Sequence, residues 1–153
     1  MDATELLKED HETVRDLLKK YEAAGDRAYQ TKKGLFEEIR DELEIHSEIE
    51  EKIFYPAVKR LRSADAEEIV DEAIEEHAIV KRLLEELDGL KPQDERFDAK
   101  MKVLKENVEH HAGEEEDEMF PEARSGMDEA RLEELGSELA EMKETLKSRF
   151  AVR

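Results

Sequence analysis

Apolar side chains recur at alternating steps of three and four residues along almost the whole chain, and this spacing is the strongest constraint on its fold. In the first part of the chain the stripe is formed by Leu7, His11, Val14, Leu18 and Tyr21. Such steps place side chains on one face of an α-helix, whereas a half-buried strand needs a step of two. Glycines and prolines, which would interrupt helices, number only 6 and 3. The sequence therefore predicts an all-α protein.

The periodic segments predict five helices, at about residues 3–24, 30–61, 65–88, 94–122 and 128–149. Pro56 is expected to kink or break the last turns of the second helix, because proline donates no backbone hydrogen bond. Short connections make consecutive helices antiparallel neighbours. The predicted architecture is an up-down-up-down four-helix bundle in residues 1–124, with an additional C-terminal helix in residues 125–153 packed on it as part of the same domain.

The composition limits the expected partners and compartment. Charged residues make up 45% of the chain, but the regular placement of the apolar 38% favours an ordered fold over disorder. The formal net charge of −19 repels phosphates and anionic lipids, so nucleic acid and membrane surfaces are not expected partners. Neither a membrane span nor a signal peptide is predicted, and the lack of cysteine excludes disulfides and thiolate metal sites. We expect a cytoplasmic protein that is a monomer or weak homodimer.

The sequence contains an internal repeat of two helical hairpins. Residues 10–18 (DHETVRDLL) match residues 76–84 (EHAIVKRLL), and residues 46–56 (HSEIEEKIFYP) match residues 111–121 (HAGEEEDEMFP) without a gap. The repeat predicts that the two halves of the bundle pack about a pseudo-twofold axis.

Four of the five histidines occupy stripe positions where an apolar residue is expected, and two glutamates follow histidines by four residues on the same face. These candidate ligands are His11, His46, Glu50, His77, His111 and Glu115. An uncompensated charge in such a buried position costs several kcal/mol, so we expect groups of opposite charge or a metal ion beside these side chains. A single histidine of this kind is more often a hydrogen-bonded core residue. The whole set, at similar heights in the bundle, indicates a metal site instead.

The fifth histidine, His110, is interpreted as a surface residue. It lies about 100° round the helix from His111 and shares its face with Glu106 and Glu114. His111, in contrast, continues the apolar stripe and is in register with His46 across the repeat. We therefore predict that His111 is the ligand.

The donor set narrows the kind of metal centre. Imidazole and carboxylate ligands suit iron, and two carboxylates in a helical bundle suit a pair of metal ions. The Glu-x-x-His pattern of ferritin-like di-iron proteins and the His-Glu-x-x-His pattern of zinc proteases are both absent from the sequence.

The order His, HxxxE, His, HxxxE, with Tyr-Pro or Phe-Pro closing the second and fourth helices, resembles the hemerythrin-like (HHE cation-binding) proteins. The resemblance covers about residues 5–122. It implies two iron ions joined by an oxo or hydroxo bridge. The implied ligands are His11 and His46 on one iron, His77 and His111 on the other, and Glu50 and Glu115 bridging both.

One position departs from the oxygen-carrying members of the family, which have a histidine four residues after the third-helix histidine. Here that position is Lys81, which cannot ligate a metal when protonated. The chain is thus similar to the symmetric bacterial type. Among the other polar residues, Glu51 and Glu116 are expected to support the ligands, and Tyr55 is expected only to pack near Pro56.

Three function classes follow from these residues. The first is a di-iron redox protein with catalase-like decomposition of hydrogen peroxide, Lys81 being a nearby proton source. The alternative is a module that binds or senses iron, dioxygen or nitric oxide without turnover. A metal-free structural bundle is the third and least favoured class.

Overall fold

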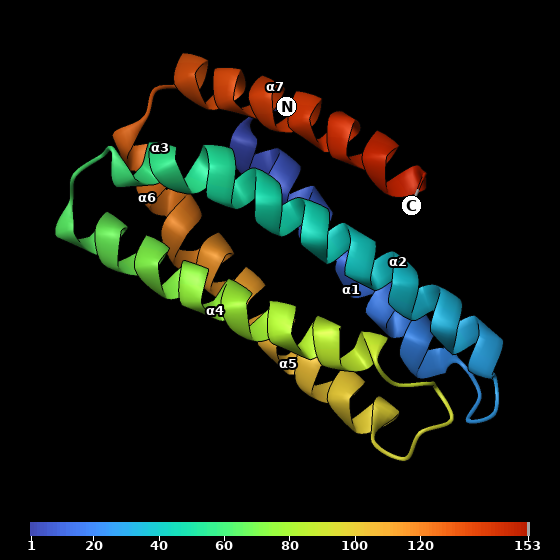
Figure 1. Ribbon diagram of the computed structural model, residues 1–153. Helices are drawn as coiled ribbons and strands as arrows, with labels where there is room; N and C mark the ends of the chain where they lie inside the picture. Colours follow the sequence, from blue (N-terminus) through green and yellow to red (C-terminus); the bar gives the residue numbers. More distant parts are fainter. Residues whose placement is uncertain (153) are drawn as a thin grey trace.

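The computed structural model describes residues 1–152, and within these residues the chain is helical, without a strand. The elements are α1 (Ala3–Ala23), α2 (Tyr29–Ile49), η1 (Glu50–Phe54), α3 (Tyr55–Lys59), α4 (Ala64–Asp88), α5 (Phe97–Glu114), η2 (Glu115–Met119), α6 (Phe120–Gly126) and α7 (Glu129–Ala151). Figure 1 shows two long antiparallel hairpins, one built on α1 and α2 and the other on α4 and α5, with α7 alongside the first. The predicted all-α bundle with a further C-terminal helix is confirmed.

The first helix begins as its sequence predicts. The Asp2 carboxylate accepts a hydrogen bond from the Glu5 backbone at 3.0 Å, and the Glu5 carboxylate accepts one from the Asp2 backbone at 3.2 Å. This capping box satisfies two backbone donors that the first turn leaves free.

Two of the predicted helices differ from expectation, because each contains one π-helical turn. The turns η1 and η2 occupy the same position in both halves of the repeat, and each ends two residues before a proline, Pro56 or Pro121. The prediction that Pro56 kinks or breaks the last turns of the second helix agrees with this irregular turn, which precedes the proline, while α3 continues through Pro56. The physical reason is that a proline ring clashes with the carbonyl four residues earlier in a regular α-helix, and the wider π turn leaves room for it.

The hydrophobic core forms two clusters, one at each end of the bundle. One cluster contains residues from α1, α2, η1, α3, α4, η2, α6 and α7, including Phe54 and Leu139. The other lies towards the α1–α2 loop and includes Phe36, Leu84 and Phe97. Buried histidines and carboxylates lie between the two clusters. The molecule therefore places its polar groups in one layer across the middle of the bundle.

The steps of three and four residues predict that Ile74 lies on the buried stripe of the third helix, between Val70 and His77, and this prediction is wrong. Ile74 is 37% exposed, and the neighbouring Ala73 takes the buried position. Ile74 instead lines a groove between α2 and α4.

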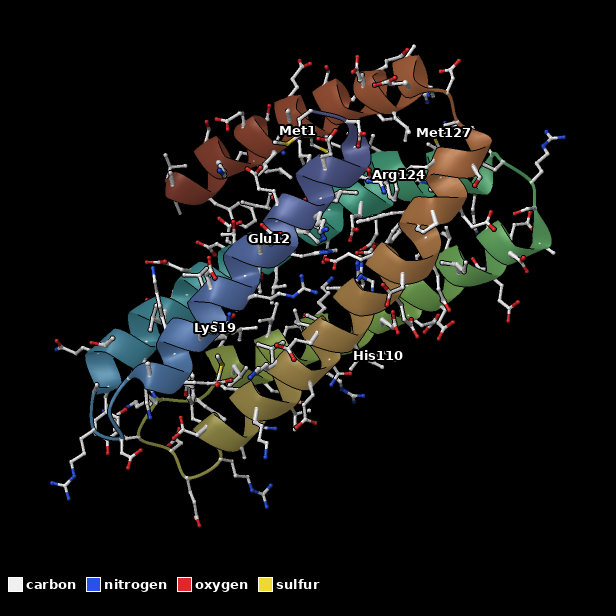
Figure 2. All side chains as sticks on the ribbon, turned by 180° about the vertical axis from the view of Figure 1, so that it is seen from behind. Met1, Glu12, Lys19, His110, Arg124 and Met127 are labelled. Carbon is white, nitrogen blue, oxygen red and sulfur yellow. The ribbon has the colours of Figure 1, made fainter. Side chains whose placement is uncertain are left out.

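The last helix, α7, packs on α1, α2 and η1, and its leucines Leu135 and Leu139 belong to the same core cluster as the bundle. Figure 2 shows the start of the chain at Met1 lying against α7. A side chain at Gly136 would collide with the Met1 carbonyl oxygen, so this close approach requires glycine. In residues 1–152 no helix is both long and apolar enough to cross a bilayer.

Candidate metal centre

Each long helix of the bundle contributes one histidine to the central polar layer. His11 comes from α1, His46 from α2, His77 from α4 and His111 from α5, and all four are at most 7% exposed. Glu50 and Glu115 are the first residues of the two π turns and are 0% and 1% exposed. The structure thus brings together all six residues that the sequence singles out.

The six side chains form two groups that share a glutamate. His11, His46, Glu50 and Glu115 have ligand atoms within 4.8 Å of one another, and so do Glu50, His77 and His111. The grouping follows the histidine pairs that the family resemblance implies.

Each glutamate contacts histidines from both groups. Oε1 of Glu50 lies 3.2 Å from Nε2 of His46 and 3.0 Å from Nε2 of His77. Oε1 of Glu115 lies 3.0 Å from Nε2 of His11 and 3.5 Å from Nε2 of His111. The two carboxylates therefore lie between the histidine pairs, where a bridging ligand would be needed.

Every one of the four histidines has a carboxylate against its other ring nitrogen, Nδ1. Glu51 lies 2.8 Å from Nδ1 of His77, and Glu116 lies 2.7 Å from Nδ1 of His11. The supporting role expected for these two residues agrees with the contacts. A carboxylate that accepts the Nδ1 proton leaves Nε2 free to bind a metal and fixes the orientation of the ring.

Two further carboxylates of this kind were missed from the sequence. Asp10 lies 2.9 Å from Nδ1 of His46, and Glu76 lies 2.7 Å from Nδ1 of His111. Each directly precedes a proposed ligand histidine on its own helix and contacts the histidine of the next long helix, and the two lie at matching positions of the repeat. That shared acidic position, in the pairs Asp-His and Glu-His, is the signal that could have found them.

Tyr55 lies at the centre of the site, which corrects the expectation that it only packs near Pro56. Its hydroxyl lies 2.6 Å from Oε2 of Glu115, 3.1 Å from Oε1 of Glu50 and 3.1 Å from Nε2 of His77. The cause is the π turn, in which the backbone N–H of Tyr55 bonds to the carbonyl of Glu50 five residues earlier. Tyr55 therefore lies one turn beyond Glu50 on the same side of the helix. In a regular α-helix of the same sequence, Tyr55 would lie about 140° round the helix axis from Glu50.

The repeat equivalent of Tyr55 is Phe120, which occupies the same place in the other half. The Phe120 ring stacks on His11 with centroids 6.0 Å apart, while the Tyr55 ring lies 5.3 Å from His77. The aromatic packing is thus shared by both halves, and the hydroxyl is present in only one.

Burial and charge together set the protonation of the metal-free cluster. Burial opposes the charge on His46, but Glu50, Asp10 and Glu115 outweigh it and raise its pKa well above the usual value. Burial likewise opposes the charge on His111, but the neighbouring carboxylates, Glu115 above all, outweigh it and raise the pKa of His111 to about 10. Burial also opposes the charge on Glu50, yet His46 and other hydrogen-bond donors hold its pKa well below the usual value.

Two buried polar atoms in residues 1–152 have no hydrogen-bond partner, Nε2 of His46 and Oε2 of Glu50. Both atoms belong to residues of the candidate ligand cluster, and buried polar groups without partners are rare in native proteins. A metal cation would satisfy both atoms at once. The donor set and its unsatisfied atoms therefore fit a metal, and specifically one that accepts mixed nitrogen and oxygen ligands.

A small chamber of about 30 Å³ adjoins the four histidines. Val14, Leu43, Val80 and Val108 form much of its apolar wall. A cavity of at least about 10–15 Å³ is needed to hold one water molecule. The chamber is therefore large enough for a molecule of two or so heavy atoms.

The charges around the two halves differ although the ligands match. Lys143 of α7 forms an ion pair with Asp10, and Arg15 forms one with Glu116. In the described chain, Glu51 and Glu76 pair only with histidines. The His11–His46 half thus has a cation beside each of its supporting carboxylates, and the His77–His111 half has none from lysine or arginine.

His110 lies outside the buried cluster. Its side chain is 64% exposed on α5, beside Glu114 and Glu76 (Figure 2). Lys81, expected to be a proton source, lines the groove between α2 and α4 and is not part of the chamber wall.

Comparison with known proteins gives consistent matches. The model of the hemerythrin HHE cation binding domain matches residues 2–123. The crystal structure of a hemerythrin HHE cation binding domain-containing protein, the Rv2633c homolog from Mycobacterium kansasii, matches with a TM-score of 0.84 at 30% identity. It covers 97% of this chain and 89% of that chain.

Two sequence relatives illustrate the range of lengths. The protein Rv2633c of Mycobacterium tuberculosis (strain ATCC 25618 / H37Rv) is 30% identical over 151 residues, covering 96% of this chain and 88% of the relative. A DNA nickase of Nostoc sp. is 27% identical over 150 residues, covering 98% of this chain. The chain spans only 41% of that relative's length.

Proposed function

Because the chain belongs to the hemerythrin HHE cation-binding domain family, we propose that it is a non-heme di-iron protein with catalase-like decomposition of hydrogen peroxide. The proposed ligands are His11 and His46 for one iron and His77 and His111 for the other, with Glu50 and Glu115 bridging them. The observation that carries the proposal is that each of these glutamates contacts histidines of both pairs.

Iron bound by these residues would supply a reversible change between the ferrous and ferric states, which is the chemistry needed to reduce one peroxide molecule to water and to oxidise the next to dioxygen. The chain's own residues set the conditions for this chemistry. The carboxylates at each Nδ1 fix the orientation of the imidazoles and leave Nε2 as the atom that faces the proposed metal site. The two apolar core clusters above and below the layer exclude bulk water.

Tyr55 is the residue that we propose to hold a proton at the site. Its hydroxyl is within hydrogen-bond distance of both glutamates. Burial, together with the charges of Glu115 and Glu50, raises its pKa well above the usual value, so the hydroxyl is protonated at neutral pH. Peroxide decomposition moves two protons for each molecule reduced, and a buried donor 2.6 Å from Glu115 is placed to take part in that transfer.

The chamber supports a small substrate. Its volume of about 30 Å³ is sufficient for hydrogen peroxide, dioxygen or nitric oxide. The same chamber suits the alternative function, a module that binds iron, dioxygen or nitric oxide without turnover.

The experiment that separates these functions uses iron-loaded protein and an oxygen electrode. We expect two iron ions per chain by metal analysis and dioxygen evolution on addition of hydrogen peroxide. His46→Ala is the control, because it removes a proposed ligand. A stable dioxygen adduct of the reduced protein, with no dioxygen evolution above the control, would favour the binding module.

A further inference from the structure

Two cavities meet beside the histidine cluster. The larger, of about 650 Å³, is an open groove between α2 and α4, and the smaller is the 30 Å³ chamber. Leu43, Ser47, His77 and Val80 line both cavities. These shared side chains therefore lie between the chamber and the groove, and Ser47 is the smallest of them.

The equivalent face of the other half, between α1 and α5, is closed differently. There the guanidinium of Arg15 reaches from α1 to Glu116 of η2, with Nη1 and Oε2 3.0 Å apart. The repeat equivalents of these residues are Lys81 and Glu51. Within residues 1–152 Lys81 and Glu51 form no ion pair with each other, although both line the groove.

A cavity of about 480 Å³ also lies beside α1 and α5, but it leads elsewhere. It is lined by residues such as Leu18, Tyr21 and Lys105, and it shares no lining residue with the chamber. The internal repeat thus has two corresponding faces, and an ion pair crosses one of them while a groove opens on the other.

The charges that line the groove distinguish anionic from uncharged ligands. Four carboxylates line it, those of Glu44, Glu48, Glu51 and Glu85, against the two ammonium groups of Lys52 and Lys81. Lys52 is paired with Glu48, with Nζ and Oε1 2.7 Å apart. An approaching anion therefore meets net negative charge, whereas an uncharged molecule meets no electrostatic barrier.

We propose that small uncharged molecules reach the histidine cluster through the α2–α4 groove, passing Ser47 into the chamber, and that the carboxylates of the groove disfavour anions. The proposal rests on the proposed function, because it supposes that a small ligand binds at the metal centre. It assigns entry to one of two corresponding faces and gives Ser47 a role in admitting the ligand.

The first test narrows the entrance without touching a proposed ligand. Ser47→Leu places a larger side chain between groove and chamber. Gly113→Leu is the matched control, because it adds the same side chain to α5, where a Cβ at residue 113 has no heavy atom within 4 Å. Association of nitric oxide with the reduced iron-loaded protein, followed by stopped-flow absorption, is expected to slow at least fivefold in Ser47→Leu and to stay at the wild-type rate in Gly113→Leu.

The second test concerns charge. Glu85→Gln removes one carboxylate from the groove, and Glu12→Gln, on the exposed surface of α1 (Figure 2), makes the same change in net charge elsewhere. Azide association with the ferric protein is expected to accelerate two- to threefold in Glu85→Gln only. Nitric oxide association is expected to be unchanged in both variants.

A third readout does not depend on iron chemistry. Crystals of the wild-type protein exposed briefly to xenon are expected to show xenon in the chamber, and Ser47→Leu crystals treated identically are expected to show less. Equal nitric oxide rates and equal xenon occupancy in wild type and Ser47→Leu would overturn the route and leave the proposed function standing. Failure of the wild type to bind nitric oxide or evolve dioxygen would instead contradict the proposed function, and the xenon result would still decide the route.

Discussion

The hydroxyl of Tyr55 lies 2.6 Å from Oε2 of Glu115, a residue 60 positions later in the chain and on the opposite hairpin. This contact joins the two halves of the repeat across the metal centre. The second half of the repeat cannot make the corresponding contact with Glu50, because Phe120, the equivalent of Tyr55, has no hydroxyl.

Tyr55→Phe tests the importance of that hydroxyl. Phenylalanine already occupies the equivalent place, so we expect the variant to fold and to retain its iron. Loss of a hydrogen bond between the hydroxyl and a carboxylate is expected to lower the free energy of unfolding by about 1.5–3 kcal/mol. The rate of dioxygen evolution should fall about tenfold or more, because the proton donor is missing. An unchanged rate with unchanged iron content would show that Tyr55 is structural only.

The two adjacent histidines of α5 provide a second prediction. His111→Ala removes a buried proposed ligand, so we expect it to lose at least one of two iron ions per chain. His110→Ala changes a side chain that is 64% exposed and should leave the iron content nearly unchanged. Metal analysis of both variants, after circular dichroism has verified their helix content, decides the assignment. The opposite pattern would mean that the ligand on α5 is His110.

Glu115 and Glu114 form a similar pair. In Glu115→Gln the shape of the side chain is kept and its charge is lost, and a bridging role predicts that the affinity for both metal ions falls. Glu114→Gln should bind nearly as much iron as the wild type, since Glu114 contacts the exposed His110. Loss of only one iron in Glu115→Gln would contradict the bridging assignment.

Metal binding should release protons. The raised pKa values of His46 and His111, the latter about 10, mean that the metal-free cluster binds protons at neutral pH. A metal needs neutral imidazoles, so binding displaces those protons, and affinity should rise up to tenfold per pH unit for each proton displaced. The rise should continue from pH 7 until the pH approaches about 10, where His111 loses its proton without the metal. Calorimetry with zinc in two buffers of different ionisation enthalpy measures the protons released, and identical heats in both would refute the prediction.

Helix periodicity was sufficient to predict most of the bundle and the inward position of the six proposed ligands. The prediction succeeded because a 3.6-residue period fixes which face a residue occupies, and His11 and His77 simply replace apolar residues on that face. The repeat added the distinction between His110 and His111. Hydrophobic pattern failed at Ile74, whose place in the core is taken by Ala73.

The π turns could not be predicted in this way. Their sequences, EEKIF and EEDEM, are ordinary for an α-helix, and only the following prolines indicate an irregularity. Tyr55 was misplaced for the same reason, because its orientation depends on the extra residue of the turn. Asp10 and Glu76 were missed because an acidic residue beside a histidine on a charged helix resembles the solvated surface around it.

A π turn is equivalent to a one-residue insertion in an α-helix, and this protein contains the insertion twice, at matching positions. Deleting Lys52, whose side chain is 57% exposed, would restore a regular α-helix in the first hairpin. His46 and Glu50, which precede the deletion, would keep their places, and Tyr55 would then follow Glu50 by four residues, which is one ordinary α-helical turn. The shortened chain would therefore keep all six proposed ligands and the hydroxyl beside Glu50. The π turn is thus a point at which the chain can lose one codon without changing the orientation of the residues that follow, whereas the same loss in the regular part of α2 would rotate them by about 100°.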